Sequence, residues 1–359
     1  MKIMTILGTR PEIIRLSLII KKLDKTCSHI LVHTGQNHHK KLNDIFFEDL
    51  QLRKPDYYLG AQANSFGEQL SIIIREIEKL LIKERPDRVL VLGDTNSGLT
   101  AVIAERMGIP VYHMEAGNRC FDLKVPEEKN RRVIDAISSY AMPYTPGSKE
   151  NLQNDGIPAR RIFVCGNPIY EVIEAYHDQI ESSGVLEKLG LKAGGYFIVT
   201  AHRAENVDTK PRLAEIINGL ESVAKKYKKP VICSIHPRTK AKLEKFKIKP
   251  KDKNIVFREP FGFFDFVKLE KNALCALTDS GTVQEECCIF NVPAVTMRDT
   301  TERPETVHCG SNMVSTVNGK RIAECAAVML AAGTNWRYPQ GYIEPDVSDR
   351  VVKFILGEN

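Results

Sequence analysis

Residues 65–94 read SFGEQLSIIIREIEKLLIKERPDRVLVLGD, a helical pattern followed directly by a strand pattern. Apolar residues recur at helical spacing from Phe66 to Leu81, and Ser65 with Glu68 forms a capping-box signature at the start. The apolar, β-branched run Val89–Gly93 then predicts a buried strand. A helix that leads into such a strand is typical of α/β proteins with a parallel sheet.

The same alternation extends over nearly the whole chain. One series of strands is predicted at 3–7, 30–34, 89–93, 111–114 and 162–165, and a second at 197–201, 231–235, 255–257, 273–278, 294–297 and 313–317. Helical patterns lie between them, so we expect doubly wound parallel sheets with helices on both faces.

The alternation breaks once, between Gly166 and Gly195, where the sequence predicts an amphipathic helix over 169–180 and then a Ser-Ser-Gly and a Gly-Gly. At 359 residues the chain is also too long for one ordinary core. We therefore predict two Rossmann-like domains, at 1–168 and 169–343. A C-terminal helix over Val347 to Leu356, within the segment 344–359, is expected to pack back on the first domain.

Composition narrows the function classes. The net charge of +6 is small for this length, and the lysine-rich stretch from Lys240 to Lys253 has one aromatic residue, which favours a solvated surface over a nucleic-acid site. The nine cysteines include no Cys-x-x-Cys pair, so no metal site is predicted, and runs such as the one around Cys233 indicate buried thiols. No leader and no membrane-length apolar run is present, so we expect a cytoplasmic protein.

Charged side chains gather after the strand at 111–114. The run from Met114 to Asp122 is followed by a second charged run, 125–132, and together they place several carboxylates beside arginines. Such a group suits proton transfer next to an anionic substrate. A solvated acidic loop in front of a helix explains the same residues, and on spacing alone both interpretations stay open.

Other candidate residues also follow predicted strands, where ligands bind in open α/β sheets. Residues 8–12, Gly-Thr-Arg-Pro-Glu, lack the Gly-x-Gly-x-x-Gly fingerprint, which argues against NAD or FAD, and Arg10 is placed to meet an anion. Asp94 follows the strand at 89–93 and could equally be a helix N-cap. His202 and Arg203 follow the first strand of the second series, and a satisfied loop histidine is the alternative there.

The second half also carries phosphate-binding signals. His236 closes one strand, and residues 279–282, Asp-Ser-Gly-Thr, lead into a helix whose backbone N–H groups and dipole favour a phosphate. Glu285, one turn into that helix, can accept both hydroxyls of a ribose.

Taken together, these motifs resemble the non-hydrolysing UDP-N-acetylglucosamine 2-epimerase family. The matching segments are 8–12, 93–95, 115–117, 126–131, 202–203, 279–286 and 298–305, in the family's order and over nearly the whole chain. The resemblance implies two Rossmann-like domains of the GT-B type that face each other across a cleft, a homodimer, and no metal or cofactor. It also implies the reaction: a base removes the C2 proton while UDP leaves C1, and the bound intermediate is reprotonated on the opposite face before UDP adds back.

The resemblance also implies roles for particular residues. The family's essential acids match Asp94, Glu115 and Glu127, and its essential histidine matches His202. Which acid serves which face of C2 stays open. The residues expected to bind the UDP-sugar are Arg10, Arg131, Arg203, His236, Phe261, Ser280, Gly281, Thr282, Glu285 and Arg303.

Two departures from the family bear on the substrate and on regulation. The run Glu115–Asp122 differs from the Glu-Ala-Gly-Leu-Arg-Thr-Gly-Asp of the UDP-GlcNAc enzymes and resembles a capsule and O-antigen branch that makes UDP-N-acetyl-L-fucosamine from its L-talo isomer. Phe121 would suit the 6-methyl group of such a sugar, so the resemblance implies epimerisation of UDP-2-acetamido-2,6-dideoxy-L-talose to UDP-N-acetyl-L-fucosamine as the expected reaction. Asn37 replaces a histidine that contributes to the family's allosteric site, which puts allosteric activation in doubt.

Four alternatives remain on the sequence alone. UDP-GlcNAc/UDP-ManNAc 2-epimerisation is the alternative within the class. A GT-B glycosyltransferase, a hydrolysing 2-epimerase and a non-catalytic UDP-sugar sensor lie outside it.

Overall fold

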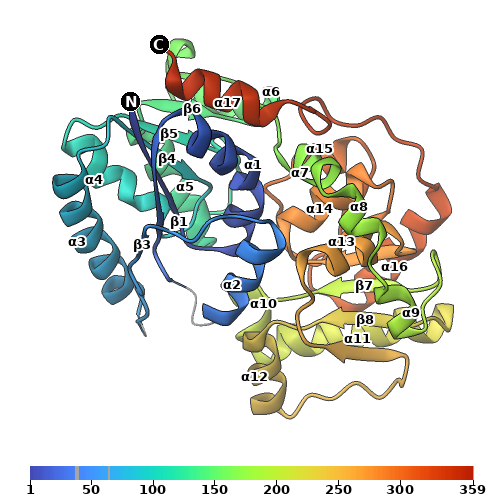
Figure 1. Cartoon of the computed structure of the whole chain (residues 1–359). Helices are drawn as coiled ribbons and strands as arrows, with labels where there is room; N and C mark the ends of the chain where they lie inside the picture. Colours follow the sequence, from blue (N-terminus) through green and yellow to red (C-terminus); the bar gives the residue numbers. More distant parts are fainter. Residues whose placement is uncertain (37–39, 64, 359) are drawn as a thin grey trace. The chain divides into compact units, whose positions relative to one another are not determined.

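The computed structural model describes residues 1–36, 40–63 and 65–358, and Asn37 lies outside them. The chain forms two compact units, Met1–Ala175 with Gln340–Asn359, and Tyr176–Pro339. Each unit is a parallel six-stranded sheet between two layers of helices (Figure 1).

In the first unit the strand order is β3-β2-β1-β4-β5-β6. The strands are β1 (Lys2–Leu7), β2 (Ser28–His33), β3 (Tyr57–Tyr58), β4 (Arg88–Leu92), β5 (Val111–Met114) and β6 (Tyr140–Met142). The neighbouring strands pair in parallel. This is the order of a doubly wound sheet. In such sheets ligands bind at the carboxyl ends of the strands where the strand order reverses, which here is between β1 and β4.

Two helical layers cover the sheet of this unit. The first contains α1 (Arg10–Thr26), α7 (Ile169–Ala175) and α17 (Val347–Leu356), which contact one another. The second contains α3 (Phe66–Glu84), α4 (Ala101–Arg106) and α5 (Pro126–Ile137), whose apolar residues join one core cluster with the strands. The remaining elements are α2 (Lys40–Asp49), α6 (Pro146–Asn154) and the 3₁₀ turns η1 (Gly98–Thr100) and η2 (Ala159–Arg161).

Local signals explain where the helices begin. At α3 the backbone N–H of Glu68 donates to Oγ of Ser65 at 3.2 Å, as the capping box predicts. At α1 Pro11 occupies the first turn, where its missing N–H costs nothing.

In the second unit the order is β12-β11-β10-β7-β8-β9, the same doubly wound arrangement. Its strands are β7 (Phe197–Thr200), β8 (Val231–Ser234), β9 (Ile255–Arg258), β10 (Cys275–Thr278), β11 (Ala294–Thr296) and β12 (Asn312–Val314). Its helices are α8 (His177–Glu181), α9 (Val185–Leu189), α10 (Ala204–Val207), α11 (Lys210–Tyr227), α12 (Pro237–Phe246), α13 (Phe263–Lys271), α14 (Gly281–Ile289), α15 (Pro304–His308) and α16 (Gly319–Ala332). One apolar cluster packs α11 and α16 on the sheet, and another packs α9, α13 and α14.

The structure corrects three sequence predictions. Residues 162–165 are not a strand, because Ile162 makes only one isolated bridge, to Ala141 of the edge strand β6. The helix expected over 169–180 is two helices, since Tyr176 leaves the helical conformation at φ −114° and ψ 21°. The first unit runs to Ala175 rather than 168. The C-terminal helix, by contrast, occupies Val347–Leu356 as predicted.

Candidate active site

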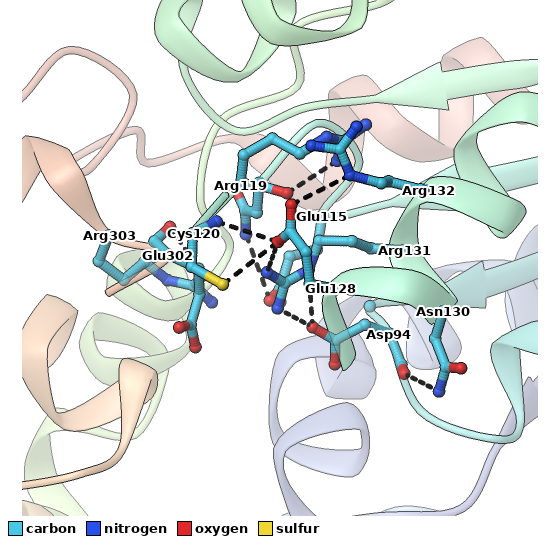
Figure 2. Close-up of polar contacts among 12 residues, drawn as sticks. Asp94, Glu115, Arg119, Cys120, Glu128, Asn130, Arg131, Arg132, Glu302 and Arg303 are labelled. Atoms are coloured by element: carbon cyan, nitrogen blue, oxygen red, sulfur yellow. Dashed lines mark hydrogen bonds and ion pairs between the residues drawn. The ribbon is translucent and has the colours of Figure 1, made fainter. Parts of the chain in front are cut away.

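Asp94 lies after the end of β4 and is held by the helix α5. Its carboxylate accepts from Nε of Arg131 at 3.1 Å and also from Nη2 of the same side chain (Figure 2). The side-chain amide of Asn130 donates to the Asp94 carbonyl at 3.0 Å. Asp94 is therefore fixed at both its side chain and its backbone by two consecutive residues of one helix.

Glu115 lies after the end of β5, the strand next to β4. Its Oε2 accepts from Nη1 of the buried Arg15 at 2.5 Å, and the Tyr144 hydroxyl lies 3.4 Å from the same oxygen. Its backbone is left-handed, with φ +64°. For a non-glycine residue that conformation costs about 1–3 kcal/mol and persists only where the surroundings fix it.

The neighbours Glu127 and Glu128 have different environments in the first turn of α5. Glu127, which the sequence predicts to be catalytic, is partly exposed. Glu128 is fully buried and accepts from Arg131 at 2.7 Å and from the Cys120 N–H at 3.0 Å (Figure 2). Burial raises the pKa of Glu128, but the hydrogen bond from Cys120 and the charge of Arg131 outweigh it, so this pKa lies below its ordinary value.

Glu12 ties the turn after β1 to the turn after β4. One oxygen of its carboxylate accepts from the Gly8 and Thr9 N–H groups at 2.9 and 2.6 Å, and the other accepts from the Thr95 hydroxyl at 3.0 Å. Burial raises the pKa of Glu12 from 4.5 to about 7, against these hydrogen bonds. Arg10, in the same turn, places its guanidinium 5.7 Å from the Phe46 ring centre, and burial lowers its pKa.

In the second unit the loop after β7 carries His202 and Arg203. The backbone N–H groups of both donate to the wholly buried Asp279 carboxylate, at 2.9 Å each, and Nδ1 of His202 lies 3.3 Å from Asp279. The ring of His236 lies 6.0 Å from that of His202, between ring centres. Asp279 thus fixes the loop, and the His202 side chain keeps 40% exposure.

The start of α14 faces a charged cluster. Glu285 is 1% exposed, and its Oε1 accepts from Nε of Arg303 at 2.5 Å. Glu302 accepts from Arg298 at 2.6 Å and from Arg203 at 3.1 Å. A Cβ at Gly281 would lie 2.9 Å from Glu302 Oε1, so any larger residue there would displace the Glu302 carboxylate.

The structure brings several sequence-predicted residues together within each unit. Asp94 contacts Arg131, His202 lies near His236, and Glu285 contacts Arg303. The N–H of Ser280, at the N-cap of α14, donates to the Thr278 hydroxyl at 2.9 Å, and Thr282 is partly exposed beyond it. Phe261 packs against the apolar cluster of α9, α13 and α14.

Sequence reasoning missed several residues that hold the site. Arg15, Glu128, Asp279 and Glu302 are buried and bind predicted site residues or their loops. Arg15 had a usable signal, because it is a charged residue on the apolar stripe of α1. Glu128 and Glu302 also had a signal, because each has an arginine three or four positions away. Asp279 had none, since its partners His202 and Arg203 lie 77 and 76 positions away.

Among the residues that the structure describes, no helix is long and apolar enough to cross a bilayer. No group of three or more His, Cys, Asp or Glu in this part of the chain is arranged to hold a metal ion.

Two doubly wound parallel sheets with chemistry at the strand ends define the GT-B class of two-unit α/β proteins. A family model described as UDP-N-acetylglucosamine 2-epimerase matches residues 21–356. The chain belongs to the UDP-N-acetylglucosamine 2-epimerase family.

Individual relatives are similar over almost their full length. The UDP-N-acetylglucosamine 2-epimerase of Methanocaldococcus jannaschii is 44% identical over 355 residues, 95% of each chain. A crystal structure of the Methanocaldococcus jannaschii UDP-GlcNAc 2-epimerase in complex with UDP-GlcNAc and UDP superposes with a TM-score of 0.94 at 43% identity, over 99% of each chain. The UDP-2,3-diacetamido-2,3-dideoxy-D-glucuronate 2-epimerase of Pseudomonas aeruginosa is 37% identical over 336 residues, 92% of each chain.

Proposed function

We propose that this protein epimerises C2 of a UDP-linked 2-acetamido sugar by eliminating and re-adding UDP, with UDP-GlcNAc and UDP-ManNAc as the interconverted pair. The observation that carries the proposal is the pair of acids at adjacent strand ends. Leu92 of β4 pairs with Met114 of β5, so Asp94 and Glu115 follow strand ends that lie side by side. Each acid contacts a buried arginine.

The chemistry accounts for an acid-rich site. A proton on the carbon that carries the acetamido group is barely acidic, and coupling its loss to departure of UDP avoids a free carbanion. Removal from one face of C2 and return on the other require two proton-transfer groups. Asp94, Glu115 and Glu127 supply candidates in the first unit.

The second unit supplies groups suited to the departing diphosphate. His202 and Arg203 follow β7, His236 caps α12, and residues 280–282 open α14. Donors and cations at these positions would stabilise negative charge that grows as the C1–O bond breaks. Glu285 with Arg303 would then define the nucleoside side of the site.

One observation favours a second substrate pair, the UDP-linked 2-acetamido-2,6-dideoxy-L-talose and UDP-N-acetyl-L-fucosamine. Phe121 is 70% exposed in the loop between Glu115 and Glu127, and its φ of +57° holds an unusual backbone conformation there. An apolar side chain favours a methyl over a hydroxymethyl group by about 0.8 kcal/mol, a few-fold preference. The relatives named above are not 6-deoxy-sugar enzymes, so this pair ranks second.

The substrate is tested by side-by-side NMR time courses on UDP-GlcNAc and on UDP-N-acetyl-L-fucosamine. We expect UDP-ManNAc to form from UDP-GlcNAc at the higher kcat/KM. A higher value for the L-fucosamine pair would assign the protein to the 6-deoxy branch. Release of UDP that depends on an added acceptor would identify a glycosyltransferase. Binding of the two UDP-sugars without formation of any product would identify a sensor.

We also propose a cytoplasmic homodimer that serves polysaccharide synthesis, such as capsule or O-antigen, as the resemblance implies. Light scattering of the purified protein tests the dimer, and a monomer mass at micromolar concentration would contradict it.

A further inference from the structure

A buried histidine and a buried aspartate in the first unit contact the turns that follow β4 and β5. His113 is the third residue of β5, and Asp135 lies on α5. Their exposures are 0% and 2%, and Nδ1 of His113 lies 2.9 Å from Oδ1 of Asp135. Charged groups are rarely buried unless they are paired or hydrogen-bonded, so the groups that this pair contacts indicate its role.

The histidine side of the pair reaches the Asp94 turn. Nε2 of His113 lies 2.9 Å from the carbonyl oxygen of Gly93. Because a carbonyl can only accept, Nε2 carries the hydrogen and donates it. Gly93 directly precedes Asp94 and has a φ of +72°, so this hydrogen bond fixes the backbone that aims the Asp94 side chain.

The aspartate side reaches the Glu115 turn. The N–H of Gly117 faces both oxygens of Asp135, at 3.2 and 3.4 Å. Gly117 has a φ of +78°, two residues after the left-handed Glu115. A Cβ at Gly117 would lie 2.1 Å from the Ser148 carbonyl oxygen, so the turn is packed too closely for any other residue.

Arg119 completes the charge balance around Asp135. Its Nη1 lies 2.7 Å from Asp135 Oδ2, and its Nη2 lies 2.7 Å from Asp155. Burial raises the pKa of Asp135, but the hydrogen bond and charge of His113 and the charge of Arg119 outweigh it, so this pKa is lowered. Asp135 is therefore a carboxylate that accepts from the turn.

We propose that His113 and Asp135 are positioning residues that fix the Asp94 and Glu115 turns relative to each other through one buried link. This inference rests on the proposed function for the roles of those two acids. Both residues are buried, so the role proposed for them is to position other groups. A proton-transfer acid displaced by about 1 Å can lose about 10²-fold in rate, so loss of the link is felt in turnover rather than in nucleotide binding.

Three variants cut the link at different points. His113→Asn keeps an amide near the Nδ1 position and loses the donor to Gly93. His113→Gln keeps an amide near the Nε2 position and loses the contact with Asp135. Asp135→Asn keeps the shape of the side chain and removes its charge.

The matched control is Glu105→Gln in the same unit. Glu105 accepts from the Val111 N–H at 2.8 Å and from the Ser139 N–H at 2.6 Å. Val111 is the first residue of β5 and Ser139 directly precedes β6, so both contacts lie at the amino ends of these strands, opposite the ends that carry the candidate acids. The Glu105→Gln substitution therefore weakens carboxylate contacts with backbone N–H groups at the amino ends of the strands, away from the Asp94 and Glu115 turns.

The measurements are kcat on UDP-GlcNAc, the Kd for UDP, and thermal unfolding by circular dichroism, on the full chain. We expect His113→Asn and Asp135→Asn to lower kcat about 10²-fold with an unchanged Kd for UDP. The decrease in kcat should be smaller for His113→Gln, because its amide can still donate to the Gly93 carbonyl. Glu105→Gln should lower the unfolding temperature and retain kcat. If Asp135→Asn does not fold, the contrast between the two His113 variants decides.

Unchanged kcat in the folded His113 variants, or an equal loss in Glu105→Gln, would overturn the inference. A wild-type enzyme that turns over neither UDP-sugar pair would instead overturn the proposed function, and the inference with it. The two failures are therefore distinguishable by the wild-type rate alone.

Discussion

Arg131 donates through Nε to the carboxylate of Asp94, at 3.1 Å, although the two residues lie 37 positions apart on different elements. The same guanidinium also binds the fully buried Glu128. One arginine therefore neutralises a candidate catalytic acid and a structural acid together.

Arg131→Ala should abolish turnover and destabilise the first unit. It would leave the carboxylate of Glu128 buried beside the partly buried Asp94, and breaking a buried ion pair from one side costs about 3–5 kcal/mol. Urea unfolding monitored by circular dichroism gives the free energy, and an NMR assay gives the turnover.

Arg132→Ala is the matched control, because Arg132 also binds Glu128, at 3.2 Å, but its side chain is 36% exposed. Its loss should cost less than about 1 kcal/mol. Equal losses of stability in the two variants would contradict the role given to Arg131.

Glu127 and Glu128 should separate function from stability in adjacent positions. Glu127→Gln should reduce kcat by about 10²–10⁴-fold, the usual contribution of a general acid or base, with little change in stability. Glu128→Gln should lower the free energy of unfolding instead, since Glu128 binds two arginines and a backbone N–H. Near-normal turnover in Glu127→Gln would remove Glu127 from the set of proton-transfer groups.

Much of the fold follows from local sequence. Helix α17 was predicted at its observed bounds, Val347–Leu356, because its apolar residues fall on one stripe. The same rules fail at the edge of the first sheet, where they do not predict the three-residue β6 and predict a strand for the apolar run at 162–165. Edge strands this short carry too few residues for a period to show.

Candidate site residues could be predicted where they follow a strand and not where they act through a partner. Asp94 and Glu115 could be singled out as candidates because they follow β4 and β5, although a helix N-cap and a solvated loop explain the same positions. Asp135 could not, because it is one polar residue on an amphipathic helix and its partners His113 and Gly117 lie 22 and 18 positions away. Only packing brings such groups together.

Glu12 should make stability depend on pH. Its folded pKa of about 7 lies above its ordinary 4.5, so the folded state holds this proton more tightly than the unfolded state. The stabilisation from protonated Glu12 is therefore complete below pH 4.5 and is lost as the pH rises through 7. The difference in pKa corresponds to about 3 kcal/mol.

Glu12→Gln isolates this contribution. Its amide oxygen can still accept from Gly8 and Thr9, and its NH₂ can donate to the Thr95 hydroxyl, which accepts as readily as it donates. We expect the free energy of unfolding of the wild type, minus that of the variant, to fall between pH 5 and pH 8. A constant difference would show that Glu12 is ionised throughout.

His202→Ala should lower turnover strongly while the Kd for UDP changes little. A donor beside the departing diphosphate meets charge that grows in the transition state, so its loss slows elimination more than it weakens ground-state binding. Asp279→Asn should lower turnover and also weaken UDP binding, because Asp279 accepts from the backbone N–H groups of both His202 and Arg203. Weak UDP binding with normal saturated turnover in His202→Ala would make His202 only an anchor.

The most direct test of the account is to incubate the protein with UDP-GlcNAc in deuterated water and follow C2 by NMR. Epimerisation through elimination and re-addition predicts one solvent deuterium at C2 of the product and the nucleotide sugar intact at equilibrium. Stoichiometric release of UDP and free hexosamine, or product that retains its original C2 hydrogen, would contradict it.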